Sequence, residues 1–213
     1  MNTIRAVLFD FDGTLTLPGS IDFMGIKRSI RCPRDVTILE FIGRLQPASA
    51  RRRAWAILHR FEDEAARRSR PNEGAEDLVR CLKRRRIRRG ILTRNRRVSV
   101  ATALKNFAQV RLADFTVIIT RDHVERPKPD PEGVLLAARR LKVKPSELLV
   151  VGDYIYDIEA GKSAGARTVF LESEFTTRRP APPADFSIRS LNEVAGLIDR
   201  LNRSRGKAHN ASG

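Results

Sequence analysis

Short apolar segments recur along the chain and alternate with segments of amphipathic helical pattern. Such short and almost continuously apolar runs are typical of strands buried on both faces of a parallel sheet. Five of them occupy residues 5–10, 88–93, 115–120, 148–152 and 167–171. Amphipathic helical patterns lie around and between them, at residues 76–85, 98–107, 131–141 and 157–164. The alternation predicts an α/β fold, with an open parallel sheet of about five strands flanked by helices.

One stretch interrupts this alternation. Residues 17–70 contain no strand-like run, and helical patterns dominate them at 36–45 and 48–68. We therefore expect a small all-helical cap at residues 17–70, inserted after the first strand of a Rossmann-like core formed by residues 1–16 and 71–203. Residues 204–213 are mostly polar or basic, and we expect them to be disordered.

Two carboxylates end the first apolar run. Asp10 and Asp12 are two positions apart, so in extended backbone their side chains point to the same side, and Gly13 then allows a sharp turn. Two like charges held together repel each other. Such a pair persists where a cation neutralises it or where one member carries a proton. The pair therefore indicates a site of chemistry.

Further polar groups follow the other predicted strands. Thr93 ends the second strand, Asp153 ends the fourth, and Asp157 follows one helical turn later. Lys128 lies in a proline-rich loop after the third strand, where the neighbouring prolines restrict its position. In open α/β sheets, ligands bind at the carboxyl ends of the strands. We expect all of these groups to meet at that edge of the sheet.

Taken in order, these residues resemble the pattern of the haloacid dehalogenase-like hydrolase superfamily, in its phosphatase branch with a helical cap, which includes phosphoglycolate phosphatases. The pattern is Asp-x-Asp-x-Thr, a strand-terminal Ser or Thr, a Lys, and Gly-Asp-x-x-x-Asp, and all four elements are present between residues 10 and 157. Residues 184–188 resemble the closing segment of the family, so the resemblance covers nearly the whole chain. Many members carry Ser or Thr after Gly-Asp, where this chain has Tyr154.

The resemblance implies a role for each residue of the pattern. Phosphoryl transfer needs a nucleophile, a proton donor and groups that neutralise phosphate charge. Asp10 would attack phosphorus and form an aspartyl-phosphate, while Asp12 would protonate the leaving oxygen and then activate water. Mg²⁺ would be the cofactor, bound by the Asp10 carboxylate, the Asp12 backbone carbonyl and Asp153, with Asp157 either a ligand or a neighbour of the ligands. The phosphate oxygens would be held by Thr93, Arg94, Lys128 and Gly13.

The function implied is hydrolysis of a small phosphate monoester, with phosphoglycolate as one candidate substrate. Asp12 favours this reaction, because dehalogenases of the superfamily need neither a second carboxylate nor Mg²⁺. The alternative within the superfamily is a phosphomutase resembling β-phosphoglucomutase. Substrate choice is expected in the cap, where Lys27, Arg28 and Arg31 form a basic cluster that suits a carboxylated phosphate. Solvated side chains on a cap helix are an equally good interpretation of this cluster.

The chain is strongly basic, with 41 Lys and Arg residues against 25 Asp and Glu residues and a formal net charge of +16. The basic residues are dispersed over many segments, which is typical of solvated helix faces. A nucleic-acid-associated protein on the same fold is the alternative from a different class, and we favour it less. No apolar stretch approaches the roughly 20 residues of a membrane helix, and Cys32 and Cys81 form no paired motif. We expect a cytoplasmic protein, a monomer or homodimer, that acts on a small phosphorylated metabolite.

Overall fold

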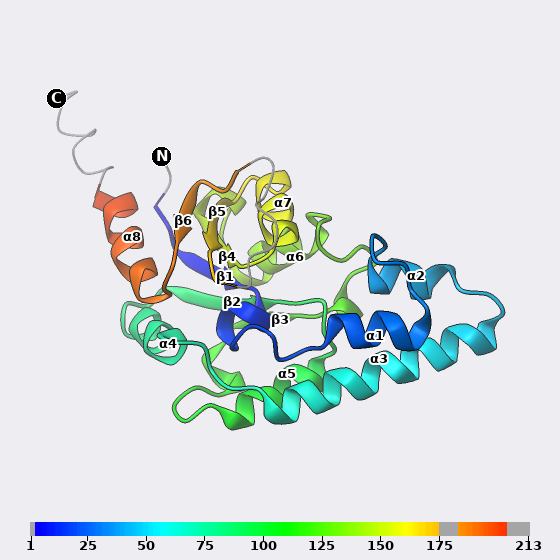
Figure 1. Ribbon diagram of the computed structural model, residues 1–213. Coiled ribbons are helices and arrows are strands. Elements are labelled where there is room, and N and C mark those ends of the chain that lie inside the picture. The colour runs from blue at the N-terminus through cyan, green and yellow to red at the C-terminus, as the bar shows by residue number, and fades with distance from the viewer. Residues whose placement is uncertain (1–2, 175–182, 204–213) are drawn as a thin grey trace.

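The computed structural model describes residues 3–174 and 183–203. Within them, six parallel strands form one open sheet in the order β3-β2-β1-β4-β5-β6 (Figure 1). The strands are β1 (Ala6–Phe9), β2 (Arg88–Leu92), β3 (Val117–Ile119), β4 (Leu148–Gly152), β5 (Arg167–Leu171) and β6 (Phe186–Ile188). The predicted α/β fold and its five strands are confirmed. The additional strand β6 is a three-residue strand at the sheet edge, too short to show a periodicity in the sequence.

Helices cover both faces of the sheet (Figure 1). One face carries α4 (Ala75–Arg84), α5 (Arg97–Ala103) and α8 (Asn192–Arg203), and the other carries α6 (Glu132–Leu141) and α7 (Ile155–Ser163). Successive side chains of a strand alternate between the two faces. In β1, Val7 and Phe9 therefore enter one apolar core while Ala6 and Leu8 enter the other. Burial on both faces explains why the strands read as continuous apolar runs.

Three helices lie between β1 and α4. They are α1 (Phe23–Ile30), α2 (Ile38–Arg44) and α3 (Ala48–Arg68), and we call residues 17–70 the helical insert. The insert has an apolar core of its own, in which Ile26, Ile42 and Leu58 are buried. The long helix α3 runs from beneath α5 to the far end of the insert (Figure 1). Its 21 residues coincide with the predicted helix at 48–68.

The insert leaves and rejoins the core at one place. Thr16 and Pro71 form an antiparallel bridge there, and the Leu17 N–H donates to the Arg70 carbonyl at 2.9 Å. The adjacent Asn72 side chain donates to the Thr14 carbonyl at 3.0 Å. The segment that returns from the insert is thereby bonded to the turn that follows β1.

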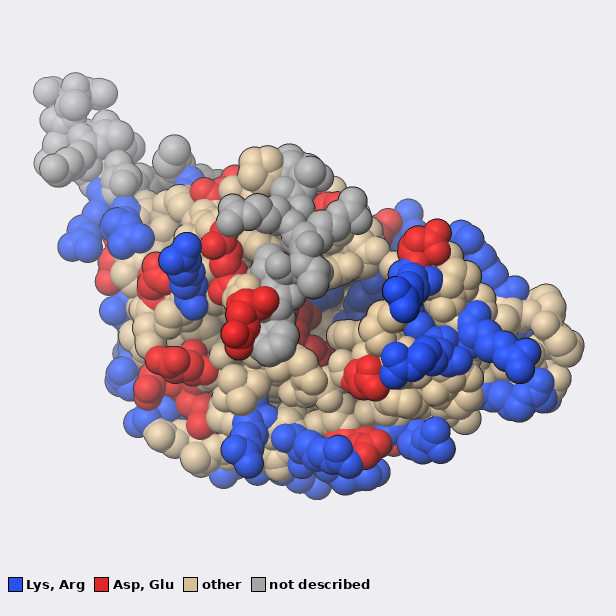
Figure 2. Space-filling model, viewed as in Figure 1, with Lys and Arg blue, Asp and Glu red and all other residues tan. Residues whose placement is uncertain are grey.

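Basic side chains are widely spread over the surface. On the face shown in Figure 2, Lys and Arg side chains lie over the insert and along the edges of the molecule, with Asp and Glu side chains between them. Within the described ranges, no helix is long and apolar enough to span a membrane.

Candidate active site

The central strands bring their carboxyl ends to one edge of the sheet. β1 lies between β2 and β4, and all three strands are parallel. Asp10 directly follows β1, Thr93 follows β2, and Asp153 follows β4. Sequence positions far apart are thus neighbours at the edge where open α/β sheets bind their ligands.

A tight turn follows β1 and holds its backbone close to Asp153. The turn covers Phe11–Leu15, and Gly13 within it has φ of 82°, a left-handed conformation that side chains other than glycine rarely adopt. A Cβ atom at Gly13 would overlap the Asp153 carboxylate. The Thr14 hydroxyl donates to Asp153 Oδ1 at 2.8 Å. Position 13 therefore requires glycine for two independent reasons.

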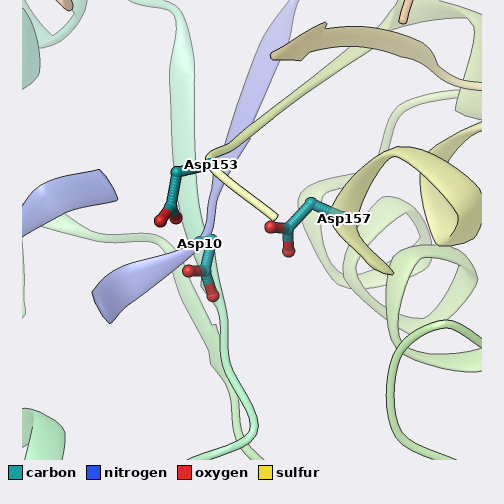
Figure 3. A group of neighbouring side chains, drawn as sticks. All are labelled: Asp10, Asp153 and Asp157. Carbon is teal, nitrogen blue, oxygen red and sulfur yellow. The ribbon is translucent and has the colours of Figure 1, made fainter. Parts of the chain in front are cut away.

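Three carboxylates form a cluster at this edge. One oxygen from each of Asp10, Asp153 and Asp157 lies within 4.8 Å of the others, and the three side chains turn toward a common space (Figure 3). Burial and the charge of Asp10 raise the pKa of Asp153 to about 8. Burial also raises the pKa of Asp157 to about 6, against the opposing effect of Lys128. A set of carboxylate oxygens held against their mutual repulsion fits a hard divalent cation.

The buried ammonium of Lys128 lies between two of these carboxylates. Its Nζ donates to Asp10 Oδ1 at 2.5 Å, to the Leu92 carbonyl at 3.0 Å, and to Asp157. Burial alone would lower the pKa of Lys128, but Asp10 and Asp157 outweigh it and hold the pKa above its ordinary value. Lys128 is therefore charged, and it offsets part of the negative charge of the cluster.

Asp12 has a different environment from the cluster. Its Oδ2 accepts a hydrogen bond of 2.6 Å from Asn95 Nδ2, and its carboxylate is not part of the three-carboxylate cluster. Burial, followed by the charges of Asp10 and Glu62, raises the pKa of Asp12 to about 8. A carboxyl group that keeps its proton near neutral pH is suited to donate that proton to a leaving group.

The remaining predicted residues lie around this centre in different situations. Thr93 is buried, and its hydroxyl oxygen accepts from the Asn95 N–H at 3.1 Å. The Arg94 guanidinium is bonded to both carboxylate oxygens of Glu40 in α2, at 2.8 and 2.9 Å, and lies 5.3 Å from the centre of the Tyr156 ring. The structure thus brings Asp10, Lys128, Asp153 and Asp157 together, whereas Arg94 is bonded to Glu40 of the helical insert. The catalytic and binding roles of all these residues stay predictions.

Two residues contact the centre that were not among the predicted site residues. Asn95 bonds Asp12, and Thr14 bonds Asp153. Both had a signal in the sequence: Thr14 is the last residue of Asp-x-Asp-x-Thr, and Asn95 follows Thr93 by two positions. Tyr154, the unusual residue beside Asp153, turns its ring outward with 46% of its surface exposed and packs edge-on against Tyr156. A large side chain is accommodated there without entering the cluster.

Comparisons with known proteins agree with this geometry. A family model described as haloacid dehalogenase-like hydrolase matches residues 4–165. An uncharacterized hydrolase of Saccharomyces cerevisiae is 33% identical over 205 residues, which are 94% of this chain and 93% of the relative. The N-acetylmuramic acid 6-phosphate phosphatase of Pseudomonas aeruginosa is 29% identical and covers 92% and 96% of the two chains. The crystal structure of a haloacid dehalogenase-like hydrolase from Bacteroides fragilis matches with a TM-score of 0.73 and 26% identity, over 90% of this chain and 100% of the other.

Proposed function

The chain belongs to the haloacid dehalogenase-like hydrolase family and is a phosphatase, and from this premise we propose that it is a Mg²⁺-dependent enzyme that hydrolyses a small phosphate monoester through an aspartyl-phosphate on Asp10. The observation that carries the proposal is the contact network at the sheet edge. There one buried ammonium, Lys128, bonds Asp10 and Asp157, while Asp12 stands apart with a raised pKa. The two carboxyl groups after β1 therefore have unequal chemistry, as a nucleophile and a proton donor require.

The reaction divides into two displacements at phosphorus. In the first, a carboxylate oxygen of Asp10 forms a bond to phosphorus, the bond to the leaving oxygen breaks, and Asp12 gives its proton to that oxygen. In the second, Asp12 as a carboxylate takes a proton from water, the water oxygen bonds to phosphorus, and the bond to Asp10 breaks. Thr93, Lys128 and the turn at Gly13 would hold the phosphate oxygens, together with Arg94.

The carboxylate cluster would hold Mg²⁺. The proposed ligands are the Asp10 and Asp153 carboxylates and the Asp12 backbone carbonyl, with Asp157 either a further ligand or a support for the others. When bound, the ion would neutralise charge on the phosphate and on the cluster. We propose residues 17–70 as the cap, which would leave the chemistry to the core and substrate choice to the insert.

The pKa values of the cluster predict how metal and pH affect stability. In EDTA, the raised pKa values of Asp12 and Asp153, about 8, mean that the folded protein keeps protons that the unfolded chain has released above pH 4. The free energy of unfolding should therefore fall as pH rises from 4 to 8. Mg²⁺ should raise the melting temperature, by about 5 °C or more at a concentration a hundred times its Kd. At one fixed Mg²⁺ concentration, this increase in melting temperature should be larger at pH 8 than at pH 5. At pH 5 the ion must displace protons from the carboxyl groups before it can bind.

Differential scanning fluorimetry with and without Mg²⁺ at the two pH values measures this effect. Asp153→Asn should lose most of the Mg²⁺-dependent increase, whereas Asp199→Asn, on α8, should keep it. An increase that is equal at pH 5 and pH 8, or unaffected by Asp153→Asn, would place the metal elsewhere.

The proposed substrate carries an acid group as well as a phosphate. Phosphoglycolate has this chemistry, and so does the compound named for the Pseudomonas aeruginosa relative, an N-acetylmuramic acid phosphate. In the insert, Lys27, Arg28 and Arg31 supply candidate cations. The Arg28 side chain is 71% exposed and forms a 3.8 Å ion pair with Asp22, so it can exchange that partner for a substrate carboxylate at little cost.

A substrate panel tests this preference. With matched pairs that differ in a carboxylate, phosphoglycolate against ethyl phosphate and N-acetylmuramic acid 6-phosphate against N-acetylglucosamine 6-phosphate, we expect kcat/KM to favour the acid by about tenfold or more. Arg28→Ala should reduce that ratio, and Arg53→Ala, on the exposed surface of α3, should not. Equal kcat/KM within both pairs would refute the acid group as a determinant.

A further inference from the structure

We propose that Glu62, a buried carboxylate on α3 of the insert, is a positioning residue for the reaction: it holds the loop that carries Thr93 and Asn95, and through Asn95 it fixes the orientation of Asp12. The inference rests on the proposed phosphatase function. It assigns a task to a charged residue that is only 3% exposed and lies outside the catalytic centre.

Glu62 binds two arginines that come from different loops of the core. Arg121, in the short helical turn after β3, donates from Nη1 to Glu62 Oε1 and from Nη2 to Oε2, the latter at 3.0 Å. Arg96, after β2, donates from Nε to Glu62 Oε2 at 3.3 Å. We call Glu62, Arg96 and Arg121 the Glu62 clamp. Arg121 is 8% exposed at its side chain and lies 5.1 Å from the centre of the Trp55 ring.

The clamp also bonds the backbone of the loop at residues 93–96. Arg121 Nη1 donates to the Arg94 carbonyl at 3.0 Å, and the Arg121 N–H donates to the Asn95 carbonyl at 3.3 Å. Between these two bonded carbonyls, the Asn95 N–H bonds Thr93, and the Asn95 side chain bonds Asp12. A continuous chain of contacts therefore runs from the insert through Arg121 and Asn95 to the proposed proton donor.

The placement of Glu62 on α3 argues for a specific use. Glu62 follows Leu58 by one turn and precedes Ala65 and Ala66, and all four residues are buried on the face of α3 that packs inward. An apolar residue at this position would fit the pattern of the helix without the cost of burying a charge. With Glu62 absent, two guanidinium groups would remain close together with one partner fewer, and the loops that carry them would move apart.

Glu62→Gln separates positioning from stability. The variant keeps the shape of the side chain and removes its charge. We expect kcat for an aryl phosphate at saturating Mg²⁺ to fall about tenfold, because misplacing a proton donor affects the transition state. KM should change less than kcat, because Lys128 and the turn at Gly13, which are proposed to hold the phosphate, lie outside the loop that the clamp holds. Glu64→Gln is the matched control, since Glu64 lies on the same helix in an exposed pair with Arg68, and it should behave as the wild type.

Two further measurements decide whether Glu62 acts through Asn95. Asn95→Ala should also lower kcat, and Glu62→Gln combined with Asn95→Ala should be no slower than the slower single variant. Hydrogen exchange of the amides at 93–96 should be faster in Glu62→Gln than in Glu64→Gln, which tests the clamp independently of catalysis. A lower melting temperature with unchanged kcat, additive losses in the double variant, or unchanged exchange at 93–96 would each overturn the proposal. If the wild type lacks phosphatase activity but exchange at 93–96 is faster in Glu62→Gln, the proposed function is refuted, while the role of the Glu62 clamp in holding this loop is supported.

Discussion

Asp10→Asn is expected to lower kcat for an aryl phosphate by at least about a thousandfold, with the fold intact. The amide nitrogen of asparagine is no nucleophile, so the first displacement at phosphorus has no attacking group. The amide oxygen can still accept the hydrogen bond that Lys128 Nζ makes to Asp10. The loss should therefore be one of chemistry, and the circular dichroism spectrum should match that of the wild type.

The control for this variant is Asp199→Asn. Asp199 pairs with Arg85 on the far side of the core from the cluster, and the same chemical change there should leave kcat within about twofold. Trapping the phosphorylated protein on denaturing gels after a brief reaction gives a second readout, which Asp10→Asn should abolish. Retained activity or retained label in Asp10→Asn would refute Asp10 as the nucleophile.

The sequence was sufficient for the parts of this molecule that follow from local pattern. The buried strands were predictable as apolar runs because helices cover both faces of the sheet. Since parallel strands end at the same edge, the residues after those strands, Asp10, Thr93 and Asp153, could be placed together before any contact was known. The long helix α3 was equally predictable, because its apolar residues repeat at helical spacing.

What the sequence did not show depends on contacts between distant segments. The engagement of Arg94 by Glu40 joins a strand end to α2 across 54 positions, and no local periodicity encodes such a pair. Glu62 lies on an otherwise apolar face of α3, and this position in the sequence indicates that its carboxylate is buried. Its partner Arg121 is 59 positions away, so the pair itself cannot be predicted from local pattern. Ion pairs between the insert and the core thus emerge from packing. They lie where substrate choice and positioning are proposed to reside.

Lys128→Met should cost about 3–5 kcal/mol of unfolding free energy at pH 8 in EDTA, as well as most of the activity. Methionine nearly fills the same volume, so the loss reports the charge. Without the ammonium, Asp10 and the buried Asp157 remain close together, and burial already raises the pKa of Asp157 to about 6 with Lys128 in place. Leaving buried charge uncompensated is the costly event, whereas forming the ion pair gains little by itself.

The pH dependence of this cost is what identifies its origin. In Lys128→Met, the loss of the ammonium should leave burial and the charge of Asp10 to raise the pKa of Asp157 in the folded state further above that in the unfolded chain. A carboxyl group whose folded-state pKa is raised contributes its full stabilisation below the unfolded-state pKa of about 4. That contribution is lost as pH rises through the folded-state pKa. The loss of unfolding free energy relative to wild type, measured by urea denaturation, should therefore be small at pH 4–5 and increase toward pH 8. Lys83→Met, which removes an exposed ammonium paired with Asp114, should cost less than about 1 kcal/mol at both pH values. A deficit in Lys128→Met that does not vary with pH would assign Lys128 a packing role and would remove the charge balance on which the proposed site depends.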